Sequence, residues 1–380
     1  MSGKAYGGVQ ASIELRLSRE AARLAKSGHN RPTGPIGPMA AMLSGGPGVL
    51  RRAIRPLLSV AAIFTTAKSF RRSPVLGSPL LNACGLHVAR LIVAHLMMGL
   101  RIRLFGVMVP APDRRAFART GLIIKPDFLP PELFARIVAE AERYQGGVQE
   151  FQEGEAITRR AMFDDPASAP GPATRSLETW KPLARTMAMA SGGAPAIWSI
   201  ECVVHGAGDP QATLHSDTFH PTAKCWLYLT DVGPTEGPFM YVVGSNRLTW
   251  RRLVWEYRRS RIARDLDDGH SEHGSLRATS DDLIELGLAE PRAIAVKANT
   301  LVVANTYGFH KRSMAPAGAM RTAIMGYARD NPFLPVSLPP VGVAQGLLAR
   351  GRQRYFRWLR RETEAGRIAG RRVYVGRLDR

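Results

Sequence analysis

The 380-residue chain has only three cysteines, and their placement excludes two classes of stabilised domain. Cys84, Cys202 and Cys225 are odd in number and widely spaced, and they contain no CxxC pair. The sequence therefore predicts neither a disulfide framework nor a cysteine-based zinc site. It favours a reducing compartment, and we expect a cytoplasmic protein.

The chain also lacks an uninterrupted apolar run long enough to span a membrane. The longest candidate, residues 75–100, is broken by polar residues and helix breakers: Pro79, Asn82, Gly85, His87, Arg90 and His95. We expect one or two amphipathic helices there instead. These helices either pack on the domain or contact an anionic membrane surface peripherally, and both alternatives stay open.

Acidic residues are scarce at both ends, although the whole chain has 52 Lys+Arg and 31 Asp+Glu for a net charge of +21. Residues 1–110 hold 15 basic and two acidic residues, and residues 340–380 hold 11 arginines and three acidic residues. The middle is neutral, so the charge gives no nucleic-acid signature for it. In the tail, aromatic residues recur at helical spacing, which argues against a base-stacking platform.

These shifts in composition divide the chain. Residues 28–49 are rich in Gly and Pro, and we predict that 1–50 is a disordered basic N-terminus. A basic amphipathic helical extension follows over 51–111, and a single domain covers 112–335. Residues 336–380 form an Arg-rich C-terminal extension, which we expect to be solvated or disordered.

The central domain is rich in short strand-like runs separated by Gly, Pro and Asp turns. The runs lie at 121–125, 196–204, 212–215, 224–230, 239–243, 293–296, 301–304, 307–311 and 322–328. Long helical periodicity appears mainly at 132–144 and 246–264. Because few strands are linked by helices, we predict a mainly β fold with flanking helices, a sandwich or barrel and not a parallel doubly wound sheet.

One stretch carries metal-binding chemistry. On a strand, His215 and Asp217 project from the same face because side chains alternate with period two. His310, in a second strand-like run, is the best candidate for a third ligand. Two histidines and one carboxylate form the facial triad of non-haem Fe(II) oxygenases. The alternative is a hydrogen-bonded His–Asp pair in a core or turn.

Arg321 follows His310 by eleven residues, across a predicted turn at 316–318. If His310 and Arg321 lie on paired strands, the guanidinium sits deeper in the cavity that holds the metal. A planar guanidinium holds a carboxylate by two charge-assisted hydrogen bonds. 2-Oxoglutarate requires both groups: its keto-acid end chelates a metal with open positions, and its far carboxylate needs a cation such as a buried arginine.

These motifs resemble the phytanoyl-CoA dioxygenase family of Fe(II)/2-oxoglutarate oxygenases. The matching segments, in the family's order, are TGLIIKPDFLPPEL (120–133), HSD (215–217), KCWLYLTD (224–231), EGPFMYVVGSN (236–246), LVVANTYGFH (301–310) and Arg321. The resemblance implies a double-stranded β-helix (jelly-roll, cupin-like) core. It implies Fe(II) held by His215, Asp217 and His310, and 2-oxoglutarate anchored by Arg321, with lesser cosubstrate contacts from Trp226 and Ser313.

The resemblance further implies a dioxygenase that uses O2 and 2-oxoglutarate, hydroxylates a small or lipid-like and perhaps anionic substrate, and releases succinate and CO2. Retention of Asp217 favours hydroxylation, because related halogenases have a small residue there. Two alternatives stay open. One is a catalytically silent jelly-roll that binds membrane or polyanion through its basic termini, and the other is a sugar- or nucleotide-binding jelly-roll with another metal.

Other histidines of the domain are open to a structural or a metal-binding role. His205 and His220 flank the HxD motif, where we expect hydrogen-bonded or exposed histidines. His270 and His273 share a predicted loop, and the alternative to an ordinary loop is a second metal site. The basic helix predicted at 247–264 either packs one face on the core or overhangs the pocket as a lid that contacts a substrate anion.

Overall fold

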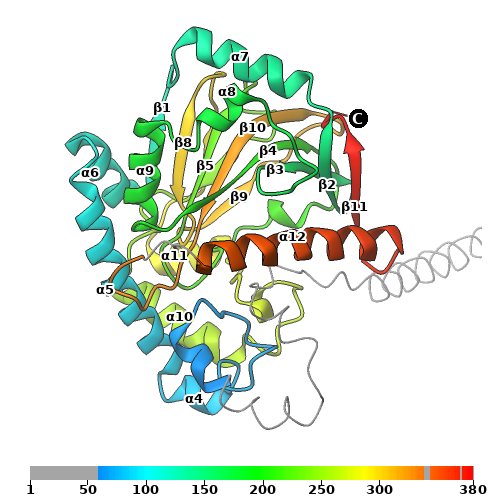
Figure 1. The fold of residues 1–380 in the computed structure, drawn as a ribbon. Coiled ribbons are helices and arrows are strands. Elements are labelled where there is room, and N and C mark those ends of the chain that lie inside the picture. Colours follow the sequence, from blue (N-terminus) through cyan, green and yellow to red (C-terminus); the bar gives the residue numbers. More distant parts are fainter. Residues whose placement is uncertain (1–58, 338–342, 369, 380) are drawn as a thin grey trace, which may run out of the picture.

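Short antiparallel strands form the centre of the molecule, and helices lie outside them (Figure 1). The computed structural model describes residues 59–337, 343–368 and 370–379. The segment 1–50, predicted to be disordered, lies outside these residues. The mostly antiparallel sheets and their covering helices confirm the predicted jelly-roll core with flanking helices.

The larger sheet of the described residues has eight strands in the order β1-β8-β5-β10-β4-β3-β2-β11, and all neighbours are antiparallel. The strands are β1 (Leu122–Lys125), β2 (Gly146–Glu153), β3 (Ala156–Met162), β4 (Ala196–Val204), β5 (Ala223–Tyr228), β8 (Leu301–Asn305), β10 (Met320–Ala328) and β11 (Arg371–Gly376). The central strands β8 and β5 read as nearly continuous apolar runs, because they are covered on both faces.

A smaller sheet has the order β7-β6-β9 and contains β6 (Phe239–Tyr241), β7 (Arg292–Ile294) and β9 (His310–Arg312). Its side chains meet those of the larger sheet in one buried cluster. That cluster joins Trp226 and Tyr228 of β5 to Phe239 and Tyr241 of β6. The two sheets therefore face each other across an apolar interior, as in a jelly-roll.

Helices cover the other face of the larger sheet. They include α7 (Pro131–Glu142), α8 (Pro172–Ser176) and α9 (Lys181–Ser191), and α9 packs on β5 and β8. Ile137 of α7 and Leu183 of α9 are fully buried there with Ile200 of β4. Pro131 stands in the first turn of α7, where the missing N–H costs no hydrogen bond.

The N-terminal part forms η2 (Ala62–Phe64), α4 (Pro79–Ala83), α5 (Leu86–Gly106) and α6 (Ala111–Thr120). This confirms the helices predicted before the domain. One side of α5 is buried through Leu91, Ala94 and Met98, and the helix packs on α9 and on α10 (Trp250–Ile262). Among the described helices, none is long and apolar enough to cross a membrane. The remaining short helices are η3 (Pro210–Ala212), η4 (Ser271–His273) and α11 (Ser280–Leu286).

The C-terminal extension differs from its prediction. Its described part is ordered into α12 (Val343–Glu364) and β11, and β11 pairs with β2 along the edge of the larger sheet (Figure 1). Leu378, just beyond β11, is buried in the main core. The prediction of disorder is therefore wrong for these residues, because the tail covers an otherwise open sheet edge, although most of their side chains stay exposed or half-buried.

Two further predictions are wrong in detail. Residues 212–215 form no strand: η3 occupies the start of this run, and His215 makes only isolated bridges. His310 and Arg321 do not lie on paired strands either. The turn at 316–318 carries the chain from the smaller to the larger sheet, where β10 takes β4 and β5 as its neighbours.

Candidate metal centre

His215 and His310 lie opposite each other in an isolated antiparallel bridge. His215 N–H donates to the His310 carbonyl (3.0 Å), and His310 N–H donates to the His215 carbonyl (2.9 Å). Side chains of directly opposed residues project on the same face. The two imidazoles therefore lie side by side, with ring centroids 4.4 Å apart, and both are buried.

Asp217, two residues after His215 in the same loop, completes the group. Its backbone N–H donates to the Thr306 carbonyl (2.9 Å), which fixes the loop against the chain just before His310. Its Oδ1 lies 3.8 Å from Nε2 of His215 and 3.6 Å from Nε2 of His310. The three prospective ligand atoms lie within 4.8 Å of one another, and this is the one such cluster among the described residues.

Hydrogen bonds to the far ring nitrogens set the tautomers. Nδ1 of His215 contacts the Thr213 carbonyl (2.8 Å), and Nδ1 of His310 contacts the Gly308 carbonyl (2.9 Å). Since a carbonyl only accepts, each Nδ1 carries a proton, and each Nε2 is left facing Asp217 as the prospective ligand atom. Two imidazole nitrogens and one carboxylate are a donor set that fits Fe(II).

The electrostatics keep these groups ready to bind a cation. Burial, followed by the charges of His310 and Arg277, holds the pKa of His215 well below its usual range, so the imidazole is neutral. Burial alone raises the pKa of Asp217, but Lys224 and the two histidines outweigh it, and the pKa lies well below its usual range. Lys224 Nζ pairs with Asp217 Oδ2 at 2.7 Å.

Arg321 lies in the interior between the two sheets and is 7% exposed. It shares the inward face of β10 with Ala323 and Met325, which belong to the interior cluster. Its guanidinium donates to the Tyr228 hydroxyl (3.4 Å). Within the described residues, no carboxylate lies within 4.0 Å of it. The nearby acids are already paired: Glu201 with Arg160 at 2.7 Å and Asp209 with Arg312 at 2.7 Å.

The two lesser predicted contacts differ in their surroundings. Trp226 is buried on the inward face of β5, and its ring stacks on Phe239 (4.8 Å), which in turn contacts the His310 ring (5.6 Å). Ser313 donates its hydroxyl to the Met314 carbonyl (3.3 Å). Among the described residues no hydrogen bond joins Ser313 to Arg321, so its cosubstrate contact stays a prediction.

The remaining histidines stay outside the cluster. His220 is fully buried, and its Nδ1 contacts the Pro221 carbonyl (3.0 Å). His205 is buried beside Arg321, and burial with that charge lowers its pKa to about 4. His273 contacts the Ser69 hydroxyl (3.3 Å) and Glu272, and His270 does not join it in a metal-binding group within the described chain.

Three cations at the centre were not predicted as functional. Lys224 precedes Trp226 by two residues on β5, so strand alternation could have placed it on the inward face. Arg277 bridges His215 from the side opposite His310. Lys68 Nζ donates to the Asp217 carbonyl from a segment 149 residues away, which no sequence pattern links to the motif.

No protein-family model and no curated protein sequence matches the chain. Among solved structures, it is similar to HygX of Streptomyces hygroscopicus with nickel, 2-oxoglutarate and hygromycin B bound, at 15% identity and a TM-score of 0.38, covering 58% of this chain and 88% of that one. It is also similar to the epimerase SnoN in complex with Fe3+, alpha-ketoglutarate and nogalamycin RO, at 17% identity and a TM-score of 0.41, covering 60% and 90%.

A third similar structure is AviO1 of Streptomyces viridochromogenes Tue57, at 20% identity and a TM-score of 0.38, covering 60% of this chain and 96% of that one. Likenesses of this degree concern the fold at most. The resemblance to the phytanoyl-CoA dioxygenase family stays a prediction from the motifs, and the chemistry of the centre follows from its own geometry.

Proposed function

We propose that the chain is an Fe(II)- and 2-oxoglutarate-dependent dioxygenase that hydroxylates a small organic substrate and releases succinate and CO2. The observation that carries the proposal is the combination of the His215–Asp217–His310 cluster with Arg321 in the same interior. A buried guanidinium without a carboxylate partner in the described residues is costly, and an anionic ligand offsets that cost. The two-carboxylate cosubstrate fits both groups.

Each residue of the proposed centre has its own role. The two imidazoles and Asp217 hold the metal, which when bound supplies O2 activation and oxidation of a C–H bond. Arg321 and the Tyr228 hydroxyl orient the far carboxylate of 2-oxoglutarate. Trp226 and Phe239 line the space between the sheets and exclude water from it. Lys224 holds the Asp217 carboxylate in its ionised form.

Anaerobic addition of Fe(II) and 2-oxoglutarate tests the proposal. We expect a metal-to-ligand charge-transfer band in the visible spectrum of the wild type and its loss in Asp217→Ala. Asp231→Ala, which removes an exposed carboxylate of an ion pair, serves as the matched control and keeps the band. Absence of the band in the wild type would favour the silent jelly-roll, and metal uptake without 2-oxoglutarate-dependent succinate formation would favour the binding protein with another metal.

We also propose that α5 contacts an anionic membrane surface, an addition that does not depend on the enzymatic activity. The outward side of this helix presents a row of exposed apolar side chains: Ile92, Val93, Leu96, Leu100 and Leu104. Leu96 is 69% exposed. The helix contains no acidic residue. Exposed arginines lie at its end and on α6, namely Arg103, Arg114, Arg115 and Arg119. This basic rim disfavours a second copy of the same face and favours anionic lipid.

A further inference from the structure

Residues 62–72, here called the strap, cross the loop that carries His215 and Asp217. Arg90 of α5 holds one end of the strap. Its guanidinium stacks on the Phe219 ring (4.3 Å) and donates at 2.7–3.3 Å to four strap carbonyls, those of Ala62, Ile63, Thr65 and Ala67. The strap is therefore fixed through its backbone on a buried cation.

The other end of the strap is held by the loop around η4. Arg71 N–H donates to the Glu272 carbonyl (2.8 Å), and the Ser69 hydroxyl contacts Nδ1 of His273 (3.3 Å). Gly274 has φ +81°, and a Cβ there would lie 2.2 Å from the Lys68 carbonyl oxygen. The loop thus approaches the strap as closely as glycine allows, and the position of Lys68 is well defined.

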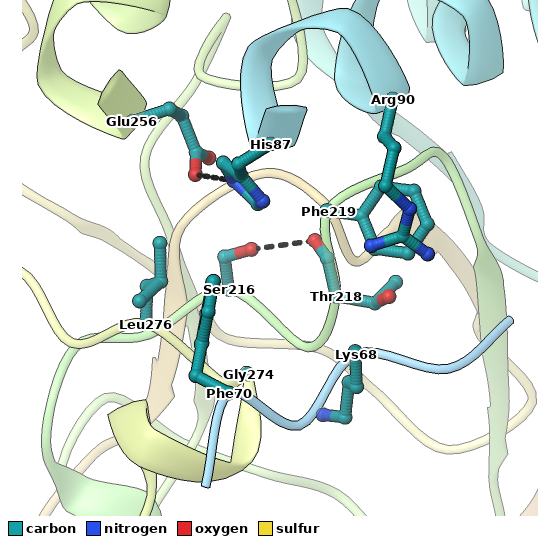
Figure 2. A pocket seen from close by; sticks show the side chains of 10 residues that line it. All are labelled: Lys68, Phe70, His87, Arg90, Ser216, Thr218, Phe219, Glu256, Gly274 and Leu276. Carbon is teal, nitrogen blue, oxygen red and sulfur yellow. Dashed lines mark hydrogen bonds and ion pairs between the residues drawn. The ribbon is translucent and has the colours of Figure 1, made fainter. Parts of the chain in front are cut away.

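This arrangement delivers Lys68 to the metal-ligand loop. Figure 2 shows Lys68 and Phe70 of the strap beside Ser216 and Thr218, the two sequence neighbours of Asp217, in a small pocket. Lys68 Nζ donates to the Asp217 carbonyl. The side chain is only partly exposed, and burial, together with Arg329, lowers the pKa of Lys68 to about 7.

Arg277 lies next to the same loop, and its charge is one of those that act on Lys68. It bridges His215 in antiparallel fashion, opposite the His310 bridge, so its side chain projects beside the His215 ring. The guanidinium donates to the Thr213 carbonyl at 3.4 Å. Burial lowers the pKa of Arg277 to about 10, which still leaves it charged at neutral pH.

Neither basic group has an ion-pair partner among the described residues. In the part of the chain that the structure describes, no carboxylate oxygen lies within 4.0 Å of Lys68 or Arg277. Two other cations near the centre are paired, Lys224 with Asp217 and Arg312 with Asp209, both at 2.7 Å. Arg321 donates to the Tyr228 hydroxyl, and Arg329 donates to the Thr66 carbonyl of the strap. Two partly buried basic groups without an ion-pair partner in the described chain, both next to the same loop, form a site for an anion, and an anion there favours the protonated form of Lys68.

We propose that Lys68 and Arg277 bind an oxyanion group of the substrate, a carboxylate or a phosphate. The inference rests on the proposed function for the reaction, since it assigns the anion to the molecule oxidised at the adjacent centre. Arg321 is separate, because it lies between the sheets on β10 and serves the cosubstrate. The strap thereby contributes substrate selection from outside the segments that resemble the oxygenase family.

Calorimetric titration of the full chain, loaded anaerobically with Fe(II) and 2-oxoglutarate, tests this site. Inorganic phosphate and acetate are the two probes, titrated at constant ionic strength. We expect one of them to bind with unit stoichiometry. Lys68→Met and Arg277→Met each weaken that binding at least about tenfold, since each removes a charge-assisted hydrogen bond. Phosphate against acetate distinguishes the two oxyanions.

Lys68→Arg and Arg277→Lys retain the charge and should restore binding, while Lys297→Met, an exposed ion-paired lysine, should leave it unchanged. Failure of both probes to bind the wild type, or equal binding by wild type and both methionine variants, would overturn the inference. The visible charge-transfer band reports the proposed function independently. Oxyanion binding without that band would reject the oxygenase and keep the anion site.

Discussion

His215 and His310 are 95 positions apart in sequence, yet each donates its backbone N–H to the other's carbonyl, at 3.0 and 2.9 Å. Their rings lie 4.4 Å apart because backbone pairing places them, and not because of any contact between the rings. Both Nδ1 atoms also bond to carbonyls two residues before them. The geometry of the two imidazoles is thus built into the main chain.

The first prediction concerns metal affinity. His310→Ala removes one of three prospective ligands and should weaken binding of Fe(II) or Co(II) at least about 100-fold, since even groups that only support ligands contribute 10–100-fold. Equilibrium dialysis measures the change. His273→Ala, which removes a half-buried histidine outside the cluster, should alter affinity less than about twofold. Equal losses in the two variants would contradict the assignment.

The second prediction concerns the cosubstrate. Arg321→Ala should raise the KM for 2-oxoglutarate at least roughly tenfold, because a charge-assisted pair contributes about 1.5–3 kcal/mol. Succinate formation measures it. Arg321→Lys keeps the charge but not the planar fork and should give an intermediate KM. An unchanged KM in Arg321→Ala would reject the anchoring role.

The third prediction concerns acid stability. Burial lowers the pKa of His95 to about 4, and neither ring nitrogen has a hydrogen-bond partner. As the pH falls below about 6.5, His95 binds a proton in the unfolded chain, whereas in the folded chain it stays neutral until about pH 4. Stability is therefore complete above pH 6.5 and declines toward pH 4, by up to about 3 kcal/mol for this group.

Urea unfolding at several pH values measures this decline. His95→Phe, which keeps a ring beside Tyr307, should lose less stability on acidification than the wild type. Lys297→Met should keep the full decline. A pH dependence that His95→Phe leaves unaltered would show that other groups are responsible.

The fourth prediction concerns the C-terminal strand. Leu378 is 5% exposed and belongs to the main core. Leu378→Ala should lower the free energy of unfolding by about 2–4 kcal/mol, the usual result for a buried leucine. Chemical denaturation measures it against Leu334→Ala, in which the leucine is 45% exposed and the expected loss is under about 1 kcal/mol. Similar losses would place the tail outside the core.

The fifth prediction concerns α5. The double variant Leu96→Gln, Leu100→Gln removes two side chains that are 69% and 55% exposed. Partition onto anionic liposomes in a flotation assay should fall at least about tenfold, because apolar area inserted in the interface drives binding. Ile284→Gln, a control at a 74% exposed position on α11, should float like the wild type. Flotation of the double variant at the wild-type level would refute membrane contact.

The sequence predicts those parts of the molecule in which periodicity and burial coincide. β4 was expected at its observed bounds, and β1, β5, β8 and β10 within a few residues. The cluster of His215, Asp217 and His310 was also foreseen, although by strand alternation at 212–217. In the structure, His215 lies in irregular chain and bridges His310, the first residue of β9, while the Asp217 N–H bonds to the Thr306 carbonyl. The residue types therefore predicted which three side chains lie together, even though the local conformation predicted for them was wrong.

Strands β2, β3 and β11 could not be predicted, because their charged residues interrupt the alternation of apolar and polar residues that indicates a strand. Arg159 pairs with Glu150 (2.8 Å) and Arg160 with Glu201 (2.7 Å) across neighbouring strands. Read along the chain, these residues suggest a solvated surface, and their compensation exists only between strands. Lys68 is hidden for a similar reason, since its partner lies 149 residues away.

The hydrogen bonds from Arg90 to the strap have a consequence for sequence variation. The guanidinium makes four hydrogen bonds to the strap, all of them to carbonyl oxygens, which every amino acid supplies. Residues 62–67 can therefore vary in side-chain identity without a change in the position of Lys68. Related chains would diverge at these positions while keeping Lys68 and Arg90, so a short variable stretch directly before a fixed lysine, with a fixed arginine further along the chain, would mark this architecture in an alignment.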